Sequence, residues 1–275
     1  MSTPSIEDVR KRFIAPPGKP FDLSSRDSGD RDLFPDKKHA RKSLKSDAGA
    51  IDELQDLLYA TREKALLIVL QGMDTSGKSG VIRNVFAQTS PLGMKVKAFK
   101  APTRIELGHD YLWRVHEATP RKGFVGIFDR SQYEDVLVVK VRNFAPADQV
   151  EQRYEQINQF EKHLTENGTK ILKFMLHVGY EEQGIRLKER ITEPHKRWKF
   201  NPADLDDRKI WPEFMKAYET MVERCSTDWA PWYVIPSDSR TRRNAAIARI
   251  IRGAMEDLKL QWPDPGYKLE DFDFG

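Results

Sequence analysis

Five short apolar segments recur along the chain, each bounded by residues that favour turns. Segment 65–71 reads ALLIVLQ and contains no polar residue before its final glutamine. An apolar run of this length without alternation is typical of a strand that is buried on both faces of a parallel sheet. The segments that we predict to be strands are 65–71, 94–99, 123–129, 169–178 and 231–236.

Amphipathic stretches lie between these segments. The clearest keeps its apolar residues on one helical face, namely Val150, Tyr154, Ile157, Phe160 and Leu164. A last helix is expected over residues 242–258. Strands that alternate with helices imply right-handed βαβ crossovers, so we predict an α/β fold of three layers, α/β/α, around a five-stranded parallel sheet.

The N-terminal part of the chain differs from the rest. Residues 1–45 are rich in Pro, Gly, Ser and charge, and we expect a loosely ordered basic arm there. A helix is predicted to begin near Ser46, with Ser46 or Asp47 as its cap, because apolar residues then recur at helical spacing. We therefore expect one main domain over residues 46–262, followed by a tail over residues 263–275.

The composition limits the class of protein. Hydrophobic residues make up 39% and charged residues 32% of the 275 residues, as in an ordinary globular protein. No apolar run approaches the roughly 18 residues that a membrane span needs, so we expect no membrane association. The one cysteine, Cys225, excludes an internal disulfide framework and is expected to be a buried apolar residue. We expect the protein in the cytoplasm.

The net charge of +4 is modest, but the basic residues are clustered. Each cluster is compatible with a solvated surface, whereas several clusters around one phosphate site would hold a long polyanion. The two clusters contain Lys37, Lys38, Arg41, Lys42 and Lys45 before the first strand, and Lys95, Lys97, Lys100 and Arg104 in and after the second.

A complete phosphate-binding motif follows the first predicted strand directly. Residues 72–79 read GMDTSGKS and satisfy G-x-x-x-x-G-K-[ST]. Its glycines let backbone N–H groups converge on phosphate oxygens, and the helix that follows directs its positive end to the same place. Lys78 supplies a charge for the transferred group, and the Ser79 hydroxyl is a Mg²⁺ ligand. The strand before the motif and the helix after it make a chance match improbable.

Acidic and basic residues accompany this motif. Asp129 ends the third predicted strand, where a carboxylate can hold Mg²⁺ if the strand neighbours the first, and Arg130 follows it. Asp74 lies inside the loop, where it would approach the metal or orient an acceptor phosphate. The alternatives are turn-stabilising roles for Asp74 and Asp129.

Segment 184–198, GIRLKERITEPHKRW, is predicted to belong to a mobile lid over residues 180–212. Arg186 and Arg190 share a helical face, and Pro194 is expected to break the helix. The cations expected to close over the phosphates are Arg186, Lys188, Arg190 and Lys196. The alternative is a solvated basic helix.

His109 and His116, on another predicted helix, have no acidic or cysteine partners at ligand spacing and are expected to pack rather than bind metal.

Five blocks of the sequence together resemble the polyphosphate kinase 2 family over residues 30–260. They are GMDTSGKSG, APTRIELGHDYLWRVHEATPRKG, FDRSQYEDVLVVKV, RLKERITEPHKRWKF and WAPWYVIPSD. The resemblance implies a P-loop kinase fold like that of thymidylate kinase, with a helical lid, and a Mg²⁺-dependent transfer between inorganic polyphosphate and a nucleotide, with Mn²⁺ as an alternative ion. It also implies a homo-oligomer. Residues 133–141 are similar to the subgroup that accepts AMP and ADP, and Gln132 stands where ADP-only members have Trp. Guanine nucleotides are a further expected class of substrate.

The resemblance also assigns roles by position. The residues that match essential motif positions are Asp74, Lys78, Asp129, Arg130 and Arg190. Phosphate binding falls to Gly72, Thr75, Ser76, Gly77, Lys78 and Ser79, and the metal to Asp74, Ser79 and Asp129. Our candidates for the walls of a polyphosphate channel are Lys78, Arg83, Lys97, Lys100 and Arg104.

Two other functions are compatible with the motifs. An ATP-dependent nucleoside-monophosphate kinase of the thymidylate-kinase type shares the loop with Asp74 and the Asp129–Arg130 pair. A P-loop protein that binds nucleotide without turnover has no need of lid cations, which speaks against it. Nucleic-acid binding is not expected, because the basic arm lacks an aromatic stacking platform. Donor preference, tested with polyphosphate and ATP, separates the two kinases.

Overall fold

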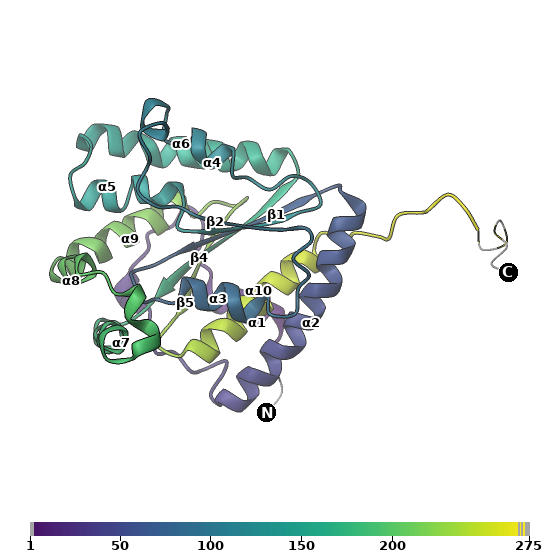
Figure 1. The fold of residues 1–275 in the computed structure, drawn as a ribbon, viewed down its shortest axis with the longest axis horizontal. Coiled ribbons are helices and arrows are strands. Elements are labelled where there is room, and N and C mark those ends of the chain that lie inside the picture. Colours follow the sequence, from purple (N-terminus) through teal and green to yellow (C-terminus); the bar gives the residue numbers. More distant parts are fainter. Residues whose placement is uncertain (1–2, 269, 271, 273–275) are drawn as a thin grey trace.

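The computed structural model describes residues 3–268, 270 and 272 and contains one five-stranded parallel sheet (Figure 1). The strand order is β2-β3-β1-β4-β5, so β1 is central. All five predicted strands are confirmed: β1 (Ala65–Gln71), β2 (Met94–Ala98), β3 (Val125–Asp129), β4 (Thr169–His177) and β5 (Trp232–Pro236). The sheet places the ends of β1 and β3 side by side, since Leu70 pairs with Asp129.

Helices cover both faces of the sheet, which confirms the predicted three layers (Figure 1). Side chains of β1 alternate between two hydrophobic clusters: Leu66 and Ile68 belong to one, and Leu67 and Val69 to the other. The first cluster includes α1 (Ile6–Phe13), α2 (Lys37–Thr61), α3 (Lys78–Val85) and α10 (Arg240–Glu256). The second includes α4 (Trp113–His116), α5 (Val138–Val141), α6 (Ala147–Glu166) and α9 (Trp211–Cys225). Cys225 is fully buried, as expected.

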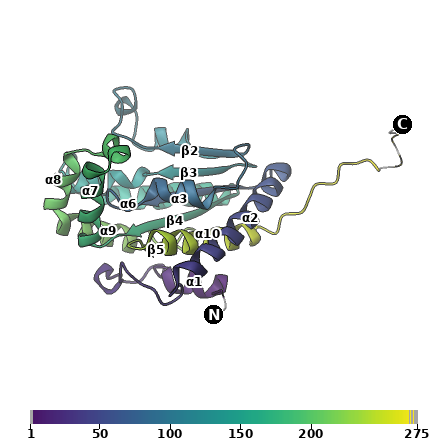
Figure 2. The same cartoon turned by 60° about the horizontal axis from the view of Figure 1, so that its bottom comes forward.

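The remaining elements lie mainly at the end of the sheet where the strands finish (Figure 2). They are α7 (Tyr180–Thr192), which follows β4, and α8 (Ala203–Lys209). The α7 helix ends two residues before Pro194, as the sequence predicted. Four short 3₁₀ turns complete the described elements: η1 (Leu23–Ser25), η2 (Glu106–Gly108), η3 (Gln132–Asp135) and η4 (Pro194–Lys199).

The N-terminal segment is not a loosely ordered arm in its described part. Ser5 caps α1 through a reciprocal pair of bonds with Asp8. Val9 and Phe13 of α1 are buried in the cluster that contains α10. After α1, the Ala15 N–H donates to the Trp232 carbonyl at 2.8 Å, which covers part of the β5 edge. A short apolar stripe, formed by Ile6, Val9 and Phe13 at helical spacing, anchors this segment.

The helix predicted from Ser46 begins at Lys37 instead. Its cap is Asp36, whose carboxylate accepts from the Lys38 N–H at 2.9 Å. Asp47, which we expected to cap the helix, is fully buried inside it and pairs with Arg249 at 2.9 Å. The inward face of the first turns is therefore partly polar, and this is why hydrophobic periodicity did not reveal them. The boundary expected after residue 45 falls inside this helix.

Three further expectations concern smaller features. His109 and His116 do not share a helix: His109 follows η2 and stacks on Trp113 with ring centroids 4.0 Å apart, whereas His116 ends α4. Beyond α10 the described tail runs away from the body (Figure 1), and residues 269, 271 and 273–275 of the tail expected over 263–275 lie outside the described residues. In the described part, no helix is long and apolar enough to cross a membrane.

Candidate active site

The phosphate-binding motif forms a tight loop between β1 and α3. Gly72 and Gly77 have φ values of 146° and 105°, and Thr75 also has a positive φ, 64°. A Cβ on Gly77 would lie 2.0 Å from a nitrogen of Arg243, so both the backbone and its neighbour require glycine there. The loop thus lies between a central strand and a helix N-terminus, the arrangement that binds phosphate oxygens.

Lys78 is buried at the first position of α3. Its ammonium donates to the Gly72 carbonyl at 2.8 Å and to the Met73 carbonyl at 3.5 Å, so the side chain lies along the loop. Burial, with a smaller contribution from repulsion by Arg130, lowers the pKa of Lys78, while Asp74 and Asp129 oppose the shift. The cation lines the cavity beside the loop, where the sequence placed it.

Arg130 connects the loop with the segment after β3. Its guanidinium donates to Asp74 at 2.8 Å and to Glu134 at 3.2 Å, and its φ is 65°. Burial opposes the charge of Asp74, but attraction to Arg130 and Lys78 outweighs it and lowers the pKa of Asp74. Burial also opposes the charge of Arg130, but attraction to Glu134 and Asp74 outweighs it and raises the pKa of Arg130. Both side chains remain charged at neutral pH.

The oxygens available for a divalent cation lie beside these residues. Asp129 and Ser79 both line the cavity next to Lys78. Among the described residues, the Asp129 carboxylate has no hydrogen-bond donor or ion-pair partner, whereas Asp74 is held by Arg130. One carboxylate and one hydroxyl, completed by substrate phosphates and water, are the oxygen ligands that Mg²⁺ prefers. The residues therefore fit Mg²⁺ at Asp129 and Ser79, and Asp74 has a protein partner already.

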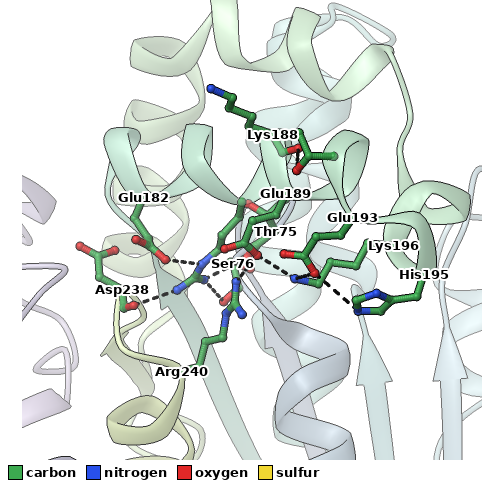
Figure 3. Close-up of polar contacts among 12 residues, drawn as sticks. Thr75, Ser76, Glu182, Lys188, Glu189, Glu193, His195, Lys196, Asp238 and Arg240 are labelled. Carbon is green, nitrogen blue, oxygen red and sulfur yellow. Dashed lines mark hydrogen bonds and ion pairs between the residues drawn. The ribbon is translucent and has the colours of Figure 1, made fainter.

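Arg186 differs from the expectation of a mobile lid cation. It is 4% exposed, and its guanidinium donates to the carbonyls of Thr75, Ser76, Ser237 and Asp238 as well as to the Glu182 carboxylate. The bond to Thr75 is 3.0 Å long. Figure 3 shows four of the residues that accept from Arg186, namely Glu182, Asp238, Thr75 and Ser76, close to one another. Arg186 thus joins α7 to the outer side of the phosphate loop.

The other predicted lid residues divide into two groups. Arg190 and Lys196 line the cavity, and Arg190 also donates to Asp204 at 2.7 Å. Lys188 is exposed and does not line the cavity, and in Figure 3 its ammonium points away from the contacts of the loop. Its position on the outer face of α7 follows from helical spacing, since it lies two residues from both Arg186 and Arg190.

Most of the predicted channel walls lie elsewhere. Among the candidates only Lys78 lines the cavity of about 340 Å³ at the loop. Lys97 belongs to the edge strand β2, which β3 separates from β1, and its ammonium lies 5.6 Å from the Phe99 ring centre. Lys100 and Arg104 are exposed in the loop after β2, and Arg83 is exposed in the second turn of α3. Strand order, which the sequence did not reveal, accounts for Lys97, Lys100 and Arg104, whereas Arg83 lies on the exposed face of α3.

Three charged residues of the cavity escaped the sequence analysis as site residues. They are Glu189, Arg240 and Arg243, and Lys199 of the predicted lid segment also lines the cavity. Arg240 and Arg243 lie in the first turn of α10, and Arg243 is 2% exposed and donates to the Ser76 carbonyl at 2.7 Å. The dense RTRR run at residues 240–243 was the available signal. Burial, followed by repulsion from Arg186 and Arg240, lowers the pKa of Arg243 to about 9.

Gln132, which the resemblance marked as a difference from ADP-only relatives, is also buried. Gln132 is 1% exposed, and its amide donates to Glu161 at 3.0 Å. The same carboxyl group accepts from Tyr133 and Lys173, and both Glu161 and Lys173 have fully buried side chains. Gln132 therefore supports the segment after Arg130 from behind and does not line the cavity.

Known proteins share this architecture along nearly the whole chain. An AMP/ADP-polyphosphate phosphotransferase of Meiothermus ruber is 44% identical over 258 residues, which are 94% of this chain and 96% of that protein. An ADP-polyphosphate phosphotransferase of Rhodopseudomonas palustris is 37% identical over 267 residues and 92% of each chain. The crystal structure of polyphosphate kinase 2 from Arthrobacter aurescens TC1 superposes with a TM-score of 0.92 at 37% identity, and the match covers 98% of this chain and 96% of that one.

The family model for polyphosphate kinase 2 matches residues 34–263, which include every element from α2 to α10. That match spans the phosphate loop, the Asp129–Arg130 pair and the segment from α7 to α8. Together with the two relatives and the superposed structure, it shows that the chain belongs to the polyphosphate kinase 2 family.

Proposed function

We propose that the chain is an enzyme that transfers the terminal phosphoryl group of inorganic polyphosphate to AMP and ADP. The observation that carries this proposal is the cavity at the phosphate loop, which eight basic and three acidic residues line. A polymer of phosphates offers no base or sugar for recognition, so a dense set of cations is the binding chemistry it requires. The names of the relatives, AMP/ADP-polyphosphate and ADP-polyphosphate phosphotransferase, support the same reaction.

In the proposed mechanism, positioning and charge neutralisation provide the catalysis. The backbone N–H groups of the loop and the Lys78 ammonium hold the transferred phosphoryl group. Arg130, fixed by Asp74 and Glu134, and Arg190, fixed by Asp204, both line the cavity. These fixed cations neutralise charge as the phosphoryl group moves. Asp74, charged at neutral pH, orients the acceptor phosphate through Arg130.

We propose Mg²⁺ as the metal, held by Asp129 and Ser79, with Mn²⁺ as a substitute. When bound, the ion shields the negative charge of the phosphates. Segment 180–212 acts as the lid in this proposal, and its closure excludes water, because the competing reaction is hydrolysis. Adenine nucleotides, with guanine nucleotides as further substrates, are the proposed acceptors, and the cytoplasm is the proposed location.

We also propose that the protein forms a homo-oligomer. The support is a set of exposed apolar side chains on and near the edge strand β2: Leu92, Val96, Ile105 and Leu107 are between 52% and 72% exposed. Light scattering after gel filtration measures the mass directly. A monomer at micromolar concentration would contradict the proposal.

One assay tests the proposed reaction. Purified protein is incubated with Mg²⁺, one of AMP, ADP, GMP and GDP, and either polyphosphate or ATP, and the nucleotide products are separated. We expect ADP and ATP to form from AMP with polyphosphate as donor. If ATP supports the phosphorylation of AMP and polyphosphate does not, the protein is a nucleoside-monophosphate kinase instead. If neither donor is used, the enzyme assignment is wrong.

A further inference from the structure

A network of ion pairs joins three elements at one side of the cavity. One oxygen of Glu189 in α7 accepts from Lys196 of η4 at 2.9 Å and from Arg240 of α10 at 2.7 Å. Lys196 also pairs with Glu193 at 2.8 Å. Figure 3 shows Glu189, Lys196 and Arg240 pointing toward one another beside Thr75 and Ser76. The network therefore ties the segment proposed as the lid to the body of the protein.

Glu189 is unusual among the residues that line the cavity. The other two acidic residues, Asp74 and Asp129, lie on the side of the loop and of β3. On the side built by α7, η4 and α10, Glu189 is the one acidic lining residue in the described part of the chain, and it lies among Arg190, Lys196, Lys199, Arg240 and Arg243. A carboxylate in a cationic wall lowers the affinity of that wall for an anion.

The two cations that Glu189 holds are accessible to a ligand. Arg240 is 53% exposed and Lys196 is 26% exposed at the side chain. Deeper in the same wall, Arg243 is nearly fully buried and forms no ion pair with a carboxylate in the described residues. A buried cation without an acidic partner favours an anionic ligand. Arg243 and Arg240 thus lead from the phosphate loop toward the surface.

We propose that Glu189 is an internal competitor of the polyphosphate donor: its carboxylate holds Lys196 and Arg240 in position, and a donor phosphate must displace it to reach them. This inference rests on the proposed function and adds the route of the donor, which passes over the first turn of α10. Glu189 also keeps its charge at neutral pH: its pKa is lowered because the bonds from Lys196 and Arg240 outweigh burial.

The displacement has a second consequence. Glu189, Lys196 and Arg240 belong to three different elements, so a phosphate that takes the place of the carboxylate leaves the cations bridged and removes the ion pair between α7 and α10. A donor thereby couples its own binding to the position of the proposed lid. A competing carboxylate also limits donor affinity, which favours release of a shortened polymer after transfer.

The test is calorimetric titration of the full chain with tripolyphosphate, without a nucleotide and therefore without turnover. Glu189→Gln keeps the shape of the side chain and removes its charge. We expect this variant to bind tripolyphosphate about tenfold more tightly than the parent, because one opposing charge is lost from a partly exposed wall. Arg240→Gln is expected to weaken binding of tripolyphosphate about tenfold relative to the parent. Added to Glu189→Gln, it is expected to weaken binding about tenfold relative to Glu189→Gln alone.

Glu193→Gln is the matched control. Glu193 also pairs with Lys196, but it does not contact Arg240 or line the cavity, so we expect its variant to bind within twofold of the parent. Thermal unfolding checks that each variant folds. If Glu189→Gln binds tripolyphosphate no more tightly than the parent, the competition is refuted while the donor assignment stands. If the parent protein binds no tripolyphosphate, the donor assignment fails, and this inference fails with it.

Discussion

Replacement of Arg186 by lysine tests whether this residue is a brace for the phosphate loop or a ligand of the substrate. Arginine donates here to four carbonyls and one carboxylate that surround it on several sides. Lysine preserves the charge but presents three donors from one nitrogen, so it cannot serve partners spread around a planar guanidinium. The site is 4% exposed, and water cannot replace the missing bonds freely.

The expected loss of stability is about 3–5 kcal/mol, the range for breaking a buried charged network by changing one partner. A chain of 275 residues loses about 2 °C of melting temperature per kcal/mol, so the melting temperature should fall by roughly 6–10 °C. Calorimetry measures this change, and steady-state kinetics should show a lower kcat with little change in the KM for polyphosphate. A variant that melts within about 1 °C of the parent and changes only the KM for polyphosphate would show that Arg186 is a phosphate ligand.

Three further outcomes are expected. Lys78→Ala should lower kcat about 100- to 1,000-fold with an unchanged fold, and near-normal turnover would refute its assigned role. Asp129→Asn should lower kcat by a similar factor and raise the Mg²⁺ concentration needed for half-maximal rate, as measured by Mg²⁺ titration after chelation; an unchanged requirement would place the metal elsewhere. Burial and the charge of Asp74 raise the pKa of Asp204 to about 6, with Arg190 opposing, so folding favours its protonated form. The melting temperature of the parent relative to Asp204→Asn should therefore rise as the pH falls from 7 toward 4, and a difference independent of pH would contradict the shift.

The central sheet was predictable because its signal is local. Four of the five strands, β1, β3, β4 and β5, are buried over most of their length and therefore read as largely apolar runs, whereas the exposed edge strand β2 reads MKVKA. The start of α2 was not predictable in this way, because Asp47 fills an inward position with charge, and its partners Arg249 and Arg252, about 200 residues later, make that position suitable for the core. Periodicity detects apolar faces, and it misses a face that is completed by a distant partner.

In the candidate site, too, residues with a local sequence signal were found, and residues placed by distant contacts were not. Lys78 and Asp129 were found because the phosphate motif and the end of a strand are local features, and the pairing of β1 with β3 brought them together. Lys97 does not line the cavity at the loop, and the sequence could not show this, because a basic residue in a strand carries no information about strand order. Arg243 was missed because it reaches the loop from the last helix, more than 160 residues along the chain. Tertiary contacts of this kind produce no regular spacing of residues that could be recognised in the sequence.

The choice of arginine to support the phosphate loop has an electrostatic consequence. The Ser76 carbonyl accepts from both Arg186 and Arg243, on the side of the loop away from its N–H groups. Asparagine or a hydroxyl would satisfy the same carbonyl without a charge. Two buried guanidiniums instead add positive potential beside the phosphate cradle, where water screens it little. The same two contacts tie α7 and α10 to the loop, so the elements that carry the proposed donor wall also fix the geometry of phosphoryl transfer.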